Sequence, residues 1–194
     1  MATNIIGRGL AGLLKYIKLR IGPEGLEKVL EKLSAQEKAL FKDRIHPTRW
    51  YSLKTYTNLL VIIDQEIGTG DLKVCKDIGR WAAERDFKAV YKLYTIGESF
   101  KDPVTFKTAP NIMWKGYYDR GELTIPDPPQ SLDVNEFKFR ITGVPDAQKP
   151  NCSLLEGWLE MAAKNILELN GTVTEVKCTT EGDEYCEFLW VREF

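Results

Sequence analysis

Apolar residues in the first 120 positions recur every three or four places, which is the spacing of amphipathic helices. Gly22-Pro23, and later Gly68 with Gly70, interrupt this pattern where helices are expected to end. Ser34 and Glu37 form a capping box, which marks the start of another helix. The segments predicted as helices are 4–21, a short one around 26–33, one after Ser34, 53–67, 72–82, one around 87–94 and 103–120.

The pattern changes to that of strands from residue 121. Residues 122–125 and the alternating Phe137, Phe139 and Ile141 predict two strands. A long helix follows, for which Ser153-Leu-Leu-Glu156 is a capping box with Ser153 as the N-cap. The segments 171–178 and 185–192 predict two further strands, joined by a turn at Gly182.

This order of elements predicts an α+β fold. We expect an N-terminal helical bundle packed on a four-stranded antiparallel sheet, with a long helix between the two strand pairs. At 194 residues the chain is expected to form a single domain, 1–194. Its mainly helical part is 1–120, and 121–194 contains the sheet, the long helix and the last hairpin.

Charge and hydropathy exclude some classes of partner. The net charge of −1 gives no electrostatic reason for nucleic-acid binding. No apolar run approaches the ~20 residues that a membrane span needs. Arg8, Lys15 and Lys18 interrupt the N-terminal segment, whereas a signal peptide has an unbroken apolar region. We therefore expect a cytoplasmic protein with no membrane span and no nucleic-acid partner.

Two motifs in the helical part have ordinary explanations. Gly7-Arg-Gly9-Leu-Ala-Gly12 has the spacing of a dinucleotide-binding fingerprint, but that motif requires a preceding strand and only six residues precede Gly7. A close contact between helices through small residues is the preferred interpretation. Cys75 shares a stripe with Gly79 and Ala82, which indicates a buried core thiol.

The other three cysteines are predicted to meet in space. A helix over 154–169 rises roughly 24 Å, and a strand over 171–178 travels roughly 23 Å. If the strand packs back along the helix, Cys178 returns to the level of Cys152. A hairpin centred on Gly182 then places Cys186 opposite Cys178.

Three converging thiols indicate a metal site, a disulfide with a spare thiol, or coincidence. A cytosolic location disfavours the disulfide, and zinc prefers four ligands from Cys, His or a carboxylate. The candidates for a fourth ligand are Glu175, Glu181, Asp183 and Glu184. On an ideal strand Glu175 and Cys178 face opposite sides, so spacing selects Glu175 only if the strand has a bulge.

The C-terminal pattern resembles the 4-vinyl reductase domain family. Cys152, the run from Glu175 to Cys178, Cys186 and the ending Gly182-Asp-Glu-Tyr-Cys-Glu-Phe188 match the zinc signature of that family. The upstream Gly79-Arg-Trp-Ala-Ala-Glu-Arg-Asp86 is similar to small standalone myxobacterial members. The resemblance implies one structural Zn²⁺ held by Cys152, Glu175, Cys178 and Cys186.

The resemblance also implies a fold and an association. The family shares its fold with haem-based nitric-oxide sensors and with a subunit of the Golgi tethering complex TRAPP. Its domains commonly pair through their N-terminal segments, and the helix predicted over 4–21 is apolar on one face. A homodimer is therefore expected.

The leading functional hypothesis is a non-enzymatic small-molecule-binding domain with a sensory or regulatory role. In the family, a cavity between the helices and the sheet takes an apolar or aromatic ligand, so we expect a small apolar or aromatic molecule or an acyl chain. Each candidate lining residue could equally be an ordinary core aromatic. The candidates are Trp81, Phe106, Trp114, Tyr118, Phe137 and Phe139. Any signal would pass to an output partner on another chain.

Three alternatives are weighed against the sensor. One is a structural or adaptor module without a physiological ligand. A haem-based gas sensor is disfavoured because the chain lacks the Tyr-x-Ser-x-Arg clamp, and because its only histidine, His46, lies in a predicted loop. A reductase-type enzyme is disfavoured because no catalytic motif is present, so no catalytic residue is assigned.

Overall fold

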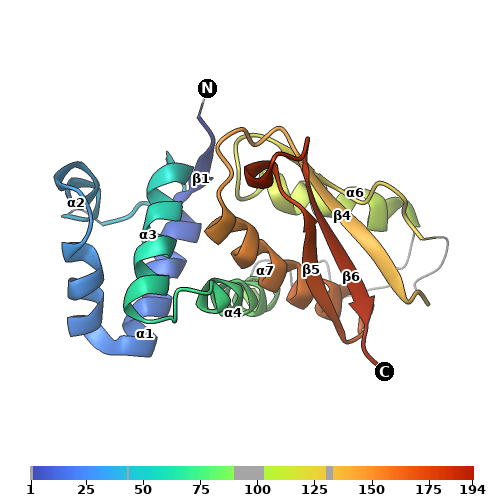
Figure 1. Cartoon of the computed structure of the whole chain (residues 1–194), viewed down its shortest axis with the longest axis horizontal. Coiled ribbons are helices and arrows are strands. Elements are labelled where there is room, and N and C mark those ends of the chain that lie inside the picture. The colour runs from blue at the N-terminus through green and yellow to red at the C-terminus, as the bar shows by residue number, and fades with distance from the viewer. Residues whose placement is uncertain (1, 43, 90–102, 130–132) are drawn as a thin grey trace.

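The computed structural model describes residues 2–42, 44–89, 103–129 and 133–194. Its elements in chain order are β1 (Asn4–Ile6), α1 (Gly7–Glu31), α2 (Ala35–Lys42), β2 (Trp50–Ser52), α3 (Leu53–Glu66), α4 (Lys73–Ala89), α6 (Pro103–Lys115), β3 (Glu122–Thr124), β4 (Glu136–Thr142), α7 (Lys149–Leu167), β5 (Gly171–Lys177), the 3-10 turn η2 (Thr179–Glu181) and β6 (Cys186–Arg192). Figure 1 shows α1, α2 and α3 at one end of the molecule and the sheet with α6 at the other. Helices α4 and α7 lie between them.

The predicted α+β architecture is confirmed. The four-stranded antiparallel sheet has the order β3-β4-β6-β5, with α7 between the strand pairs in sequence. The aromatic residues of β4 and β6 face the helices, and Phe139 pairs with Phe188 across the two strands. Phe106 of α6 packs edge-on against Phe137, with ring centroids 5.5 Å apart. The alternation of apolar and polar residues in β4 therefore separates a core face from a charged outer face.

Two glycines allow α4 and α7 to pack closely. A Cβ atom at Gly79 would lie 1.9 Å from the carbonyl oxygen of Leu154, and one at Gly157 would lie 1.9 Å from that of Lys76. Any side chain at either position would force the helices apart. This crossing fixes α7, which contributes to both candidate sites below.

The predicted start of the first helix, at residue 4, is wrong. Residues 4–6 form β1, which pairs with β2 in a two-stranded antiparallel sheet that the sequence analysis did not predict. Ile6 N–H donates to the carbonyl of Tyr117 over 2.9 Å, so pairing with distant segments overrides the local helical spacing.

The glycines after β1 serve packing. A strand does precede Gly7, contrary to expectation, but it lies in an antiparallel pair and not in the parallel unit that binds dinucleotides. A Cβ atom at Gly12 would lie 2.6 Å from the Arg85 guanidinium, so Gly12 makes room for a side chain of α4.

Three other predicted boundaries are also corrected. Helix α7 begins at Lys149, so Ser153 lies inside the helix and is not its N-cap; Pro150 occupies the first turn, where its missing N–H costs nothing. Helix α6 ends at Lys115, before the turn that follows. Helix α4 continues to Ala89, and the rest of the helix predicted over 87–94 lies outside the described residues.

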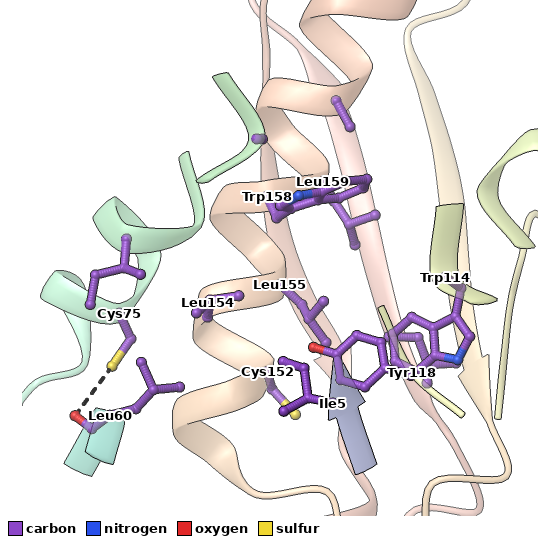
Figure 2. Packing of buried hydrophobic residues seen from close by; sticks show 14 of the residues in the cluster. Ile5, Leu60, Cys75, Trp114, Tyr118, Cys152, Leu154, Leu155, Trp158 and Leu159 are labelled. Atoms are coloured by element: carbon purple, nitrogen blue, oxygen red, sulfur yellow. Dashed lines mark hydrogen bonds between the residues drawn. The ribbon is translucent and has the colours of Figure 1, made fainter. Parts of the chain in front are cut away.

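Other local signals are confirmed. The capping box is present, since Glu37 N–H donates to the Ser34 hydroxyl over 3.2 Å and Ser34 N–H donates to the Glu37 carboxylate over 3.0 Å. Gly22 breaks α1 with a φ of 77°. Cys75 is fully buried, its thiol lies 3.9 Å from the carbonyl oxygen of Leu60 (Figure 2), and burial raises its pKa to about 12.

The apolar face of α1 is used within the chain. Leu10, Leu13 and Ile17 are buried in the core, and Leu19 remains 65% exposed. The stripe that suggested a homodimer thus already has a role inside one copy. Within the described residues, the structure contains no helix that combines the length and the apolar character needed to cross a membrane.

Candidate functional site

Cys152, Glu175, Cys178 and Cys186 converge where α7 meets the last hairpin. Each offers one ligand atom, and these four atoms all lie within 4.8 Å of one another. The Sγ atoms of Cys152 and Cys186 are 4.0 Å apart. Zinc–sulfur bonds of about 2.3 Å in a tetrahedron give a sulfur–sulfur separation of about 3.8 Å, so the observed spacing suits a closed tetrahedral metal site.

A β-bulge brings Glu175 to this cluster. Glu175 pairs with Phe188 and Lys177 pairs with Glu187, so the ladder is irregular at Val176. The extra residue in β5 turns Glu175 and Cys178 toward the same side of the strand. Of the four acidic residues considered from the sequence, Glu175 is the one that joins the cluster.

The Glu175 carboxylate is oriented by a lysine. Lys149 Nζ lies 2.8 Å from Glu175 Oε2, and it also pairs with Glu181. Glu175 Oε1 is buried and has no hydrogen-bond partner. An orphaned buried carboxylate oxygen is costly unless something pairs with it. A metal ion bound by Glu175 Oε1 would satisfy that oxygen.

Backbone and hydroxyl groups surround the thiols. Thr179 N–H donates to Cys186 Sγ over 3.5 Å, and the Thr180 hydroxyl lies 2.9 Å from Cys178 Sγ. The hydrogen bond with Cys152 lowers the pKa of Cys186 to about 6, against the effect of burial. The same bond, together with burial, raises the pKa of Cys152. The hydrogen bond between the two thiols therefore favours the thiolate form of Cys186, and thiolates are the form that binds metal.

A cavity of about 50 Å³ lies among the helices, and we call it the helix cavity. The residues that define it are Tyr56, Trp81, Asp86, Trp114, Tyr118 and Trp158. Trp114 and Tyr118 stack with ring centroids 4.0 Å apart. The walls come from segments spread from β1 to α7, so only the tertiary fold assembles them.

A second, smaller cavity of about 20 Å³ lies between α6, α7 and the sheet, and we call it the sheet cavity. The residues that define it are Phe106, Ala109, Phe137, Phe139, Ala163 and Ile166. Met113, Leu123 and Trp158 line both cavities and separate them.

The six predicted lining residues are divided between the two cavities. Trp81, Trp114 and Tyr118 line the helix cavity. Phe106, Phe137 and Phe139 line the sheet cavity. The single pocket envisaged from the sequence is therefore two neighbouring spaces.

The polar centre of the helix cavity was not predicted from the sequence. Asp86 is 3% exposed, and its Oδ2 accepts hydrogen bonds from the Tyr117 hydroxyl over 2.5 Å and from Trp158 Nε1 over 3.4 Å. Arg85 approaches its Oδ1 at 3.5 Å. A signal was present, because Asp86 lies four residues after Ala82 and continues the apolar stripe of α4.

Helix α7 connects the helix cavity to the candidate metal site formed by Cys152, Glu175, Cys178 and Cys186, which we call the metal cluster. Figure 2 shows Cys152, Leu155 and Trp158 along this helix, with Tyr118 pointing toward it. The Tyr118 hydroxyl donates to Asn151 Oδ1 over 3.2 Å, next to Cys152 in sequence. Burial raises the pKa of Tyr118, so this hydroxyl remains a donor.

Comparison with solved structures defines the fold as that of H-NOX proteins. An Fe(II) unliganded H-NOX protein from K. algicida superposes with a TM-score of 0.71 at 10% identity, covering 97% of both chains. A mutant H-NOX protein from S. oneidensis gives 0.71 at 15% identity, covering 97% of this chain and 96% of that one. At such identities the likeness concerns the fold alone.

Within that fold, residues 136–192 match the model of the 4-vinyl reductase domain family. All four residues of the metal cluster lie inside the matched segment. The resemblance inferred from the sequence is thus confirmed for the C-terminal part of the chain. The comparison with curated proteins gave no significant match.

The one histidine of the sequence does not line either cavity. His46, the only histidine in the sequence, is exposed, and its ring Nδ1 lies 3.1 Å from the Thr48 hydroxyl, away from both cavities. The helix cavity of about 50 Å³ is also far smaller than the roughly 300–1,000 Å³ of pockets for drug-sized ligands.

Proposed function

We propose that the protein is a non-enzymatic small-molecule-binding domain with a sensory or regulatory role. The observation that carries the proposal is the helix cavity, an aromatic space with one buried carboxylate at its wall. A small number of convergent polar groups in a mostly apolar cavity is typical of ligand sites.

The metal cluster has a structural role in this proposal. Four protein ligands fill a tetrahedral zinc site and leave no open position for a substrate. Zinc bound there would tie the hairpin of β5 and β6 to the first turn of α7. Because α7 also lines the helix cavity, the metal would hold one wall of that cavity in place.

A screen of small apolar compounds tests the proposal directly. Thermal-shift measurements should identify compounds that raise the melting temperature, and Ala82→Leu, which fills the helix cavity, should abolish their effect. Ala163→Leu is the matched control, because Ala163 lines only the sheet cavity. If compounds stabilise both variants equally, the helix cavity is not their site.

The size of the cavity favours a second candidate. About 50 Å³ suits a molecule of only a few non-hydrogen atoms, and an adaptor with a vestigial cavity would have such a space. The adaptor hypothesis is favoured if no compound stabilises the protein and Ala82→Leu raises the melting temperature.

The remaining features of the proposal concern association with other chains and location in the cell. We keep a homodimer, a cytoplasmic location and an output partner on another chain as parts of the proposed sensor. Light scattering tests the dimer, since the monomer mass is 22.2 kDa. A mass near that value at tens of micromolar would remove the homodimer from the proposal.

A further inference from the structure

We propose that the helix cavity selects a small organic cation, an alkylammonium ion, with Asp86 as its counter-ion and aromatic rings as its walls. This inference rests on the proposed function and names the class of ligand.

The lining of the cavity favours positive charge. Its aromatic residues in the described part of the chain are Tyr56, Trp81, Trp114, Tyr117, Tyr118 and Trp158. The face of an aromatic ring attracts a cation, and cages of aromatic residues bind ammonium groups in other proteins. A buried carboxylate among such rings adds a full opposite charge.

The Asp86 carboxylate has one well-satisfied oxygen and one poorly satisfied oxygen. Oδ2 accepts from Tyr117 and Trp158, whereas the contact of Oδ1 with Arg85 is long, at 3.5 Å. A buried carboxylate oxygen gains most from a charged donor at hydrogen-bond distance. An ammonium ion in the cavity could provide such a donor to Oδ1.

Arg85 already places a cation at the edge of this space. Its guanidinium lies 4.9 Å from the ring centroid of Trp81, and Gly12 leaves room for it. The Arg85 side chain is 30% exposed. Arg85 and Trp81 line both the helix cavity and an outer groove, whose other charged residues are Lys15, Glu84 and Lys88. Moving Arg85 into the groove would open the cavity and leave the charge of Asp86 for a ligand cation.

The charges of Arg85 and Asp86 also argue against anionic and neutral ligands. An anionic ligand could pair with Arg85 but would be repelled by Asp86, which is far more deeply buried than Arg85. A neutral alcohol could donate to Asp86 without neutralising it. The ammonium ion is the ligand that satisfies both the carboxylate and the aromatic faces.

The test compares n-butylamine, 1-butanol and butyrate, which share a four-carbon chain and differ in charge. Binding is followed by the NMR shifts of the indole N–H groups of Trp81 and Trp158. In the wild type we expect n-butylamine to bind about 10-fold more tightly than 1-butanol, and butyrate to bind most weakly. Asp86→Asn should remove the preference for the amine and keep the affinity for the alcohol.

Two variants keep the test decisive if Asp86→Asn fails to fold. Arg85→Ala removes the competing cation and should tighten n-butylamine binding about 3-fold or more, with no gain for 1-butanol. Asp77→Asn removes a carboxylate of the same helix that pairs with Arg80 and lines neither the helix cavity nor the outer groove, so it should change neither affinity. If 1-butanol binds the wild type as tightly as n-butylamine, the inference is overturned and the proposed function stands. If no apolar or charged compound binds and Ala82→Leu leaves the melting temperature unchanged, both this inference and the proposed function are contradicted.

Discussion

The metal cluster and the helix cavity are built in different ways. The four candidate metal ligands come from 35 consecutive residues, 152–186, and three of them lie in or beside one hairpin. The cavity residues come from β1, α1, α3, α4, α6, the turn after α6, β3 and α7. The pair Arg85 and Asp86 belongs to a helix far from the hairpin in sequence.

This difference reflects what each kind of site requires from the fold. A metal site needs a few donor atoms at set distances, which a helix, a bulge and a turn can provide locally. A cavity needs the absence of atoms at one place, which depends on how every neighbouring element packs. Helix α7 is common to both, and Tyr118 reaches it beside Cys152.

Loss of a metal ligand should have the largest effect. We expect wild-type protein, purified without added metal, to contain one equivalent of zinc, and Cys178→Ser to contain much less. If zinc is present at about 1,000 times its dissociation constant, its loss costs about 4 kcal/mol of unfolding free energy. That corresponds to a fall in melting temperature of roughly 8–16 °C for a domain of this size.

Cys75→Ala is the control for this experiment. Cys75 is buried but lies outside the cluster, so the variant should keep its zinc while losing some core packing. Equal zinc content in Cys178→Ser and the wild type, measured by elemental analysis, would contradict the assignment of the ligands.

The lysine that orients Glu175 should have the next largest effect. Lys149→Met removes the ion pair with Glu175 Oε2, and changes of this kind typically weaken metal affinity by about 10–100-fold. Lys177→Met is the control, because Lys177 contacts the Tyr185 hydroxyl on the outer face of the sheet. Competition with a chromogenic zinc chelator measures both variants. Equal affinities would show that Lys149 has no role at the metal.

Tyr118→Phe tests the link between the two regions. The variant leaves Asn151 Oδ1 without its donor from Tyr118, which should lower the unfolding free energy by about 1 kcal/mol. Denaturant titration measures this change, and the zinc content should remain that of the wild type. A loss of zinc would show that the two regions are coupled more strongly than one hydrogen bond implies.

The smallest effect is expected at the outer face of the sheet. Burial raises the pKa of Glu187, but hydrogen bonds and ion pairs with Arg140 and Lys138 outweigh it and hold the pKa below the ordinary 4.5. The stabilisation is therefore present above about pH 4.5 and is lost as pH falls through the lowered pKa. Glu187→Gln should cost about 0.5–1 kcal/mol at pH 7. Denaturant titrations at pH 7 and at pH 3 should show a smaller cost at the lower pH, and an equal cost at both would contradict this assignment.

Local chemistry in the sequence was enough to predict the sheet and the convergence of the cysteines. Alternation in Phe137, Phe139 and Ile141 indicates one buried face, because side chains alternate along a strand. The lengths of the long helix and the next strand match, which returns Cys178 to Cys152. The choice of Glu175 required the bulge at Val176, which strand periodicity does not reveal.

Long-range pairing decided the parts that the sequence did not determine. Ile6 fits a helical stripe, yet β1 forms because β2 and the segment after α6 offer backbone partners. The division of the aromatic residues between two cavities depends on Met113, Leu123 and Trp158, which meet only after folding. Asp86 continues the apolar stripe of α4, but only the structure showed that its carboxylate is buried, because a charged residue on a helix is usually solvated.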